Sequence, residues 1–286
     1  MLKSMRHGWR KGLTLIRETF RLHREGERQY LTLPAFDGYP ELAHLFTTRH
    51  GGVSTGCTSS WNFGARTLDS EENIRRNYEI LARTLGITAD RLVVSDQTHT
   101  TNIRVVTEDD AGKGVIRPKD YADIDGLITD VRGLAIVTGH ADCNAVFFYD
   151  PTKQVIGLAH SGWRGTLAGI SKVMVRKMAD CYGCRAEHMI TGLGPALCQD
   201  CFEVDEDVAM EFFARDERFR EFSYQKGQKY YIDLKQIIRY DLLSEGILEE
   251  HFHDMNLCTK CRRDMLFSHR GHHGKRGIMA AAMMLR

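Results

Sequence analysis

Three residues of this sequence have metal-binding side chains and lie near predicted strands: His99, Cys143 and His160. His160 directly follows the apolar run 155–159, and Cys143 comes shortly after the apolar run 134–138. Side chains at strand ends are held rigidly and yet are exposed, as a metal site requires. Two imidazoles and a thiolate are a known ligand set for catalytic zinc, with the fourth position open for water or substrate.

Spacing alone leaves other interpretations of these residues open. The chain has 13 histidines, and any of them could be an ordinary surface residue or a hydrogen-bonded core residue. Cys143 could be a buried structural thiol. It could also be a nucleophile with His160 as its base, without any metal.

The elements that position these residues alternate between strands and helices. Short apolar runs at 134–138, 145–149 and 155–159 predict buried strands. Helical spacing predicts three helices, which lie between Ser70 and Gly86, from Thr166 onward, and from Asp233 to near Gly246. The predicted fold class is therefore a mixed α+β domain.

Composition excludes several classes of protein. Lys plus Arg (39) nearly cancel Asp plus Glu (38), so a dedicated nucleic-acid binder is disfavoured. The basic N-terminal segment lacks the unbroken apolar run of a signal peptide, and no later stretch has the ~20 apolar residues of a membrane span. We expect a soluble, cytoplasmic protein that contacts no membrane. Residues 1–31 are predicted to form a basic, flexible arm, with an over-long translated start or a membrane-surface helix as alternatives, and 32–286 a single catalytic domain.

Short motifs follow one another in a fixed order from about residue 35 to the C-terminus. They are Thr48-Arg49-His50-Gly51-Gly52-Val53-Ser54, Asn62-Phe63-Gly64, Gln97-Thr98-His99, Asp125-Gly126-Leu127-Ile128-Thr129, His140-Ala141-Asp142-Cys143, His160-Ser161-Gly162-Trp163-Arg164-Gly165, Gly192-Leu193-Gly194-Pro195, Phe202-Glu203-Val204, Cys258-Thr259, Phe267-Ser268-His269-Arg270 and Gly274-Lys275-Arg276. Together they closely resemble the YfiH family, formerly labelled polyphenol oxidase or laccase-domain protein and now regarded as purine nucleoside phosphorylases.

The resemblance implies layered mixed β-sheets flanked by helices. It also implies zinc held by His99, Cys143 and His160, which are then the catalytic residues. The implied reaction is phosphorolysis of adenosine, inosine, guanosine and methylthioadenosine, with adenosine deamination as a second activity. The chain departs from the family pattern at Asn144-Ala145, Phe202 and Gly274-Lys275, which puts substrate preference in more doubt than the ligands.

Arginines suit the phosphate that such a reaction needs, because a guanidinium fork matches two phosphate oxygens. The candidates are Arg49 in a glycine-rich turn, Arg164 ahead of a predicted helix, and Arg276 near the C-terminus. Arg49 and Arg164 could each instead tie down a loop. Asp142, beside the cysteine ligand, could shuttle a proton or orient a ligand.

The older laccase label can be tested by counting histidines. A multicopper oxidase needs many His-x-His pairs, and the only one here is His251-Phe252-His253. Three copper centres are therefore excluded. Oxidase activity would reflect Cu²⁺ in the zinc site, which the Irving–Williams order makes easy.

Six of the eight cysteines form Cys-x-x-Cys pairs, at 181/184, 198/201 and 258/261. Cysteines without an export signal favour thiols or metal over disulfides. The first two pairs have zinc-ribbon spacing. A second, structural metal could instead be held by the pairs in family motif regions, Cys198, Cys201, Cys258 and Cys261. Otherwise these are small buried hydrophobes or reduced thiols.

Three functions therefore stay open. The first is a zinc-dependent phosphorylase whose partners are purine nucleosides and phosphate, acting as a monomer or homodimer. The second is a metal-free cysteine hydrolase or amidase that uses Cys143 and His160. The third is a metal-binding accessory protein without turnover.

Overall fold

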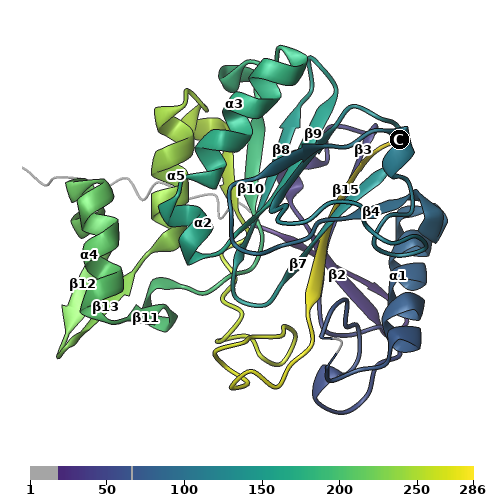
Figure 1. The fold of residues 1–286 in the computed structure, drawn as a ribbon, viewed down its shortest axis with the longest axis horizontal. Helices are drawn as coiled ribbons and strands as arrows, with labels where there is room; N and C mark the ends of the chain where they lie inside the picture. The colour runs from purple at the N-terminus through teal and green to yellow at the C-terminus, as the bar shows by residue number, and fades with distance from the viewer. Residues whose placement is uncertain (1–18, 66) are drawn as a thin grey trace, which may run out of the picture.

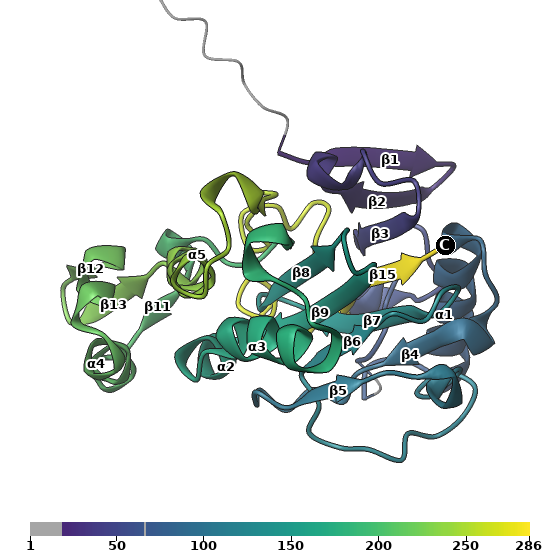
Figure 2. The same ribbon diagram turned by 90° about the horizontal axis from the view of Figure 1, so that it is seen from above.

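Two six-stranded mixed sheets lie face to face at the centre of the computed structural model, which describes residues 19–65 and 67–286 (Figures 1 and 2). The first sheet has the order β1 (Arg21–Glu25), β2 (Arg28–Thr32), β3 (Leu42–Thr47), β15 (Met279–Leu285), β7 (Ala135–His140) and β4 (Leu92–Val94). The second has the order β14 (Phe252–Asp254), β10 (Ile190–Leu193), β8 (Asn144–Asp150), β9 (Val155–Ser161), β6 (Gly126–Thr129) and β5 (Ile103–Val105). Both contain parallel and antiparallel pairs.

The central strands are apolar throughout because both of their faces are buried. In β7, Ile136 points into the core between the two sheets. Its neighbours Ala135 and Val137 point to the other face of the sheet, where they pack in one cluster with residues of helix 71–85. In β8, Phe147 lies in the same central core and Phe148 faces outward toward helices. The unbroken apolar runs that predict buried strands thus correspond to β7, β8 and β9.

Helices cover the outer faces of the two sheets. The five helices of the described residues are α1 (Glu71–Leu85), α2 (Trp163–Leu167), α3 (Ile170–Tyr182), α4 (Glu206–Arg215) and α5 (Leu234–Ser244). Helix α1 packs on the first sheet, and α3 and α5 pack on the second. The predicted α+β class with layered mixed sheets and flanking helices is confirmed.

Local capping signals place the helix ends where the sequence predicts them. The Ser70 side chain accepts a hydrogen bond from the Asn73 N–H at the start of α1, and Gly86 ends the helix at φ +80°. The Asp233 side chain caps α5 in the same way. The helix predicted from Thr166 differs: Gly169, at φ +77°, separates α2 from α3.

The N-terminal boundary also differs from the prediction. Residues 21–32 form the β1–β2 hairpin, and β2 pairs with β3, so this part of the expected basic arm belongs to the first sheet. Leu31 explains the difference, because its side chain is fully buried in the central core. Residues 1–18 lie outside the described part of the chain, and the single-domain division at 32–286 stays a prediction.

A third, smaller sheet lies to one side of the two large ones, with α4 beside it (Figure 1). Its order is β11 (Glu203–Val204), β13 (Lys229–Ile232) and β12 (Ser223–Lys226). Among the described residues, no helix is both long enough and apolar enough to cross a bilayer.

Candidate metal centre and its cavity

The three predicted metal ligands come together from three segments of the chain. His99 lies in the loop between β4 and β5, Cys143 in the turn between β7 and β8, and His160 near the end of β9. One donor atom from each side chain lies within 4.8 Å of the others. His99 is exposed, Cys143 is partly exposed and His160 is buried, so the group is open on one side.

The spacing of these donor atoms suits a tetrahedral zinc site. With Zn–S near 2.3 Å and Zn–N near 2.05 Å, a sulfur and a nitrogen on one ion lie about 3.6 Å apart. The Cys143 Sγ and the His99 Nε2 are 3.9 Å apart, so only a small closure of the site is needed. Three protein ligands would leave the fourth position open toward the exposed side.

A buried carboxylate fixes the ring of His160. The His160 Nδ1 donates to the Asp125 carboxylate over 2.8 Å, and Asp125 is fully buried. This hydrogen bond leaves the His160 Nε2 free to bind a metal, which is the common arrangement around histidine ligands. Asp125 begins the Asp-Gly-Leu-Ile-Thr motif, yet nothing in the sequence alone assigns it this contact.

The same carboxylate holds the loop that carries His99. It accepts hydrogen bonds from the backbone N–H groups of Thr98, His99 and Thr100 at 3.1, 3.1 and 2.7 Å. His99 itself adopts a φ of +68°, a conformation that non-glycine residues seldom take. Asp125 therefore positions two of the candidate ligands at once, because it holds the ring of His160 and the backbone of His99.

Gln97 ties the same loop to the end of β7. Its side-chain amide donates to the Gly139 carbonyl and its oxygen accepts the Gly139 N–H, both at 2.7 Å. Since Gly139 is four residues before Cys143, this pair of bonds sets the loop of His99 against the turn that carries the cysteine. The glutamine of the Gln-Thr-His motif is thus a positioning residue.

Electrostatics favour a thiolate at Cys143. Burial alone would raise the pKa of this thiol, but the charge on His160 and hydrogen bonds from both histidines lower it to about 6. Burial likewise opposes the charged form of His160, whereas Cys143 and Asp125 raise its pKa to about 9. A thiolate beside an imidazole is suited to metal binding and also to nucleophilic attack.

His140 lies beside this group, but both of its ring nitrogens are already used. Its Nε2 is 2.7 Å from the Thr138 hydroxyl, and its Nδ1 is 3.2 Å from the Cys143 carbonyl. Its ring packs against that of His160 with centroids 5.4 Å apart. His140 therefore supports the site rather than offering a fourth ligand.

Gly162 is required by the closeness of the ligands. A Cβ at this position would lie 2.6 Å from the His99 Cδ2 and 3.0 Å from the Cys143 Sγ. Its φ of −72° is open to any residue, so the contact alone demands glycine. The predicted motif His-Ser-Gly-Trp thus supplies a ligand and then leaves space for the other two.

The open side of the ligand group faces a cavity of about 670 Å³. Its size lies within the usual range for small-molecule sites, roughly 300–1,000 Å³. Besides the three ligands, its walls include aromatic and basic side chains, among them Phe63, Tyr78, Trp163, Phe202, His269 and Arg276.

Arg276 is the predicted arginine that lines this cavity. Its Nε is buried and has no hydrogen-bond partner, while its Nη2 lies 3.2 Å from the His269 Nδ1. Burial lowers its pKa, against the opposing charges of Asp142 and Cys143. A buried guanidinium N–H without a partner is costly, so an anion in the cavity would satisfy it.

The other two predicted arginines have structural contacts. Arg49 donates to the carbonyls of Ser59 and Arg263, and stacks on Phe267. Arg164 is exposed and lies over the Trp163 ring at 4.2 Å. Both are outside the set of residues that lines the cavity. Of the two interpretations of Arg49, its contacts favour an arginine that ties down a loop.

Asp142 lines the cavity, but its hydrogen bonds go to the C-terminal segment of the chain. Its carboxylate accepts from the Thr259 hydroxyl at 2.6 Å and from the Arg270 N–H at 2.7 Å. The carboxylate that fixes the ring of His160 is Asp125, not the sequence neighbour of Cys143.

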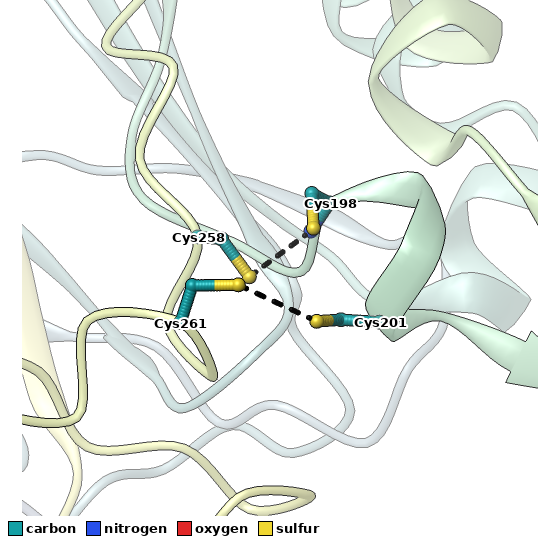
Figure 3. Close-up of side chains that lie close together, drawn as sticks. All are labelled: Cys198, Cys201, Cys258 and Cys261. Atoms are coloured by element: carbon teal, nitrogen blue, oxygen red, sulfur yellow. Dashed lines mark hydrogen bonds between the residues drawn. The ribbon is translucent and has the colours of Figure 1, made fainter.

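Four cysteines form a second group, of which Cys198 and Cys201 adjoin the cavity-lining residues Leu197 and Phe202 in the sequence. The sulfurs of Cys198, Cys201, Cys258 and Cys261 lie within 4.8 Å of one another (Figure 3). Cys181 and Cys184 lie apart, at the end of α3 and in the core beneath it. The zinc-ribbon pairing of 181/184 with 198/201 is therefore not formed.

A family model described as multi-copper polyphenol oxidoreductase laccase matches residues 43–286. The chain belongs to this laccase-like family, and the resemblance to YfiH proteins found in the sequence is confirmed. Among the described residues, however, only two groups of side chains could hold a metal ion, and they are the two described above. The first group contains two histidines, and the four-cysteine group contains none.

Relatives and solved structures of similar sequence agree with this assignment. The purine nucleoside phosphorylase YlmD of Bacillus subtilis (strain 168) is 32% identical over 245 residues, 84% of this chain and 87% of the relative. The purine nucleoside phosphorylase LACC1 of Mus musculus is 31% identical over 275 residues, 90% of this chain and 61% of the relative. The crystal structure of the hypothetical protein YfiH of Bacillus licheniformis has a TM-score of 0.85 and 31% identity, and covers 93% of this chain and 99% of that one. YlmD of Geobacillus stearothermophilus has a TM-score of 0.83 and 30% identity, with coverages of 94% and 99%.

Proposed function

We propose that this chain is a zinc-dependent purine nucleoside phosphorylase that cleaves adenosine, inosine, guanosine and methylthioadenosine with phosphate, and that it also deaminates adenosine. The observation that carries the proposal is an open group of two histidines and one cysteine facing a cavity with an unsatisfied arginine. The relatives YlmD and LACC1, both named as purine nucleoside phosphorylases, support the same reaction class.

The walls of the cavity suit the two substrates. The aromatic side chains of Trp163 and Phe202 offer apolar faces against which a purine can stack. Arg276 offers a buried N–H group to phosphate. At neutral pH most phosphate ions carry two negative charges, which favours this contact. When bound by His99, Cys143 and His160, zinc would supply a Lewis acid next to the reacting groups.

The lowered pKa of Cys143 supports a second candidate, a metal-free cysteine hydrolase or amidase with His160 as base. Both functions need the same thiolate, so their difference lies in the metal. A copper-loaded, polyphenol-oxidase-like activity would use the same three ligands.

One experiment separates these functions. The purified chain is incubated with adenosine, with and without phosphate, and adenine, ribose 1-phosphate and inosine are assayed alongside the bound zinc and copper. We expect adenine release that needs phosphate and is abolished by a chelator, then restored by zinc. Turnover that survives complete metal removal would contradict the zinc mechanism and favour the cysteine hydrolase.

Two variants test the assigned roles. Cys143→Ala should remove both turnover and one bound metal, because it deletes the thiolate ligand. Arg276→Gln should raise the KM for phosphate with zinc content unchanged, whereas the matched variant Arg164→Gln should leave that KM as it is. Equal effects of the two arginine variants would exclude Arg276 as the specific phosphate ligand.

A further inference from the structure

The four-cysteine group is made by two loops that are far apart in the sequence. Cys198 directly precedes the 3-10 turn Gln199–Cys201 and Cys201 is its last residue, whereas Cys258 and Cys261 lie in the loop that follows β14. Figure 3 shows the four sulfurs directed toward a common centre. We propose that Cys198, Cys201, Cys258 and Cys261 bind a structural zinc ion, distinct from the metal at His99, Cys143 and His160.

The distances between the sulfurs match this role. Four thiolates at about 2.3 Å from one zinc ion lie about 3.8 Å from each other. The sulfurs of Cys201 and Cys261 are 3.6 Å apart, and every pair in the group is within 4.8 Å. Two Cys-x-x-Cys pairs that face each other are the usual ligand set of a closed structural zinc site.

Burial argues against the alternative that these cysteines are only small core residues. Cys201 is buried, but Cys198 and Cys258 are half-buried and Cys261 is exposed. An exposed cysteine gains little from packing, yet its sulfur is directed to the others rather than to solvent (Figure 3). The geometry of Cys261 therefore calls for a partner at the centre of the group.

The backbone around the sulfurs also suits thiolates. The Cys198 N–H donates to the Cys258 Sγ over 3.4 Å, which offsets the negative charge that a thiolate ligand carries. The two loops are joined directly as well, since the Ala196 N–H donates to the Leu257 carbonyl and the Thr259 N–H to the Ala196 carbonyl. The ligands are thus held in place before a metal arrives.

A metal here would close a long segment of the chain. Cys198 and Cys258 are 60 residues apart, and the segment between them contains the third sheet, α4 and α5. Joining the ends of a long loop stabilises a fold by restricting its unfolded state. The chain would therefore use this zinc to attach its smaller sheet to the two large ones.

The group also contacts the wall of the candidate active site. Leu197, next to Cys198, donates its N–H to the Asp142 carbonyl, and Thr259, next to Cys258, donates its hydroxyl to the Asp142 carboxylate. Loss of the metal would therefore loosen the turn that carries Cys143 without deleting any of its ligands.

Metal content of the full chain tests the proposal independently of any enzyme activity. We compare wild type, Cys261→Ser, the double variant Cys258→Ser/Cys261→Ser, Cys143→Ala and Cys181→Ser. Cys181 is the matched control, since it is also an exposed member of a Cys-x-x-Cys pair but lies outside the group. Zinc is measured after brief dialysis against a weak chelator, and melting temperatures are recorded.

We expect the double variant to lose about one zinc ion per chain relative to wild type and to melt roughly 5 °C or more lower, whereas Cys181→Ser changes neither. The zinc that the double variant loses should still be present in Cys143→Ala. The proposal fails if the double variant keeps all of its zinc.

A measurement on wild type covers the case of a variant that does not fold. Under native conditions, a mercurial reagent should release about two zinc ions per chain together with about five ligand thiols, four from this group and one from Cys143. Native mass spectrometry that finds a disulfide-bonded chain without zinc at these cysteines would overturn the proposal. If no nucleoside turns over but this zinc is found, only the proposed function fails.

Discussion

Replacement of Asp125 by asparagine is the sharpest test of how the ligand group is organised. The carboxylate accepts five hydrogen bonds, from the N–H groups of Thr98, His99 and Thr100, the Thr100 hydroxyl and the His160 ring. An amide has one oxygen and one NH₂ group. If its oxygen replaces Oδ2, three of these bonds remain and the two to His99 and His160 are lost.

Those two losses set the expected magnitude. Hydrogen bonds to a charged group contribute about 1.5–3 kcal/mol each, so the free energy of unfolding of the metal-free chain should fall by about 3 kcal/mol or more. An NH₂ group facing His160 would also require its Nδ1 to accept, which moves the ring proton to the Nε2 and blocks the metal-binding nitrogen. Zinc affinity should fall roughly 10- to 100-fold.

Competition with a fluorescent zinc chelator measures the affinity, and thermal unfolding of the metal-free protein measures the stability. Asp123→Asn is the control: Asp123 accepts from the Thr98 hydroxyl in the same loop, and its φ of +57° suits asparagine. Zinc affinity of Asp125→Asn within twofold of wild type would refute the assignment of Asp125 as the orienting carboxylate. Equal weakening in both variants would show that any disturbance of the loop suffices.

Two further predictions concern a close contact and an ion pair. Gly162→Ala should weaken zinc binding roughly tenfold or more without changing the fold, because the added methyl group would collide with His99 and Cys143. Metal ligands must stay within about 0.5 Å of their productive positions. Unchanged zinc affinity in the chelator assay would contradict this prediction. Burial opposes the ionised form of Asp110, yet Arg104 helps to lower its pKa from 3.8 to about 2. Wild type should therefore exceed Asp110→Asn in unfolding free energy by about 2 kcal/mol near pH 7, with the difference lost between about pH 4 and 2 in urea titrations, and a constant difference would contradict the pairing.

The elements that the sequence predicts well are those specified by local patterns. Helix α1 has its cap at Ser70, its stop at Gly86 and an apolar face between them, all within a few turns. Strands β7, β8 and β9 are short apolar runs because both faces are buried. In contrast, the helical pattern after Thr166 does not reveal that Gly169 takes a left-handed conformation, since glycine is compatible with a helix as well.

The β1–β2 hairpin shows a second limit of local patterns. Its sequence is rich in charge, which suggests an exposed arm, but pairing with β3 satisfies its backbone and buries Leu31. A strand at the edge of a sheet needs only one buried face, and its other face can carry charged side chains. Charge alone therefore cannot separate an edge hairpin from an arm.

Residue types and family motifs single out the three candidate ligands, whereas they do not identify the residues that support them. Asp142 is next to Cys143 in the sequence, yet its φ of +92° belongs to a tight turn and its carboxylate bonds Thr259 instead of a ligand. Asp125 is 35 residues from His160 and still contacts its ring. Sequence proximity to a ligand is thus a poor guide to which carboxylate orients it, because the strands bring distant residues together at the sheet edge.

Asp142 lies between the two proposed metal sites and connects them through its hydrogen bonds. Its backbone leads into Cys143, its carbonyl accepts the Leu197 N–H, and its carboxylate accepts the Thr259 hydroxyl. The last two partners adjoin Cys198 and Cys258 in the sequence. A change in the cysteine group would therefore reach Cys143, the proposed catalytic cysteine, through Asp142. Removal of either Asp142 contact should affect substrate turnover more than zinc content at the proposed three-ligand site.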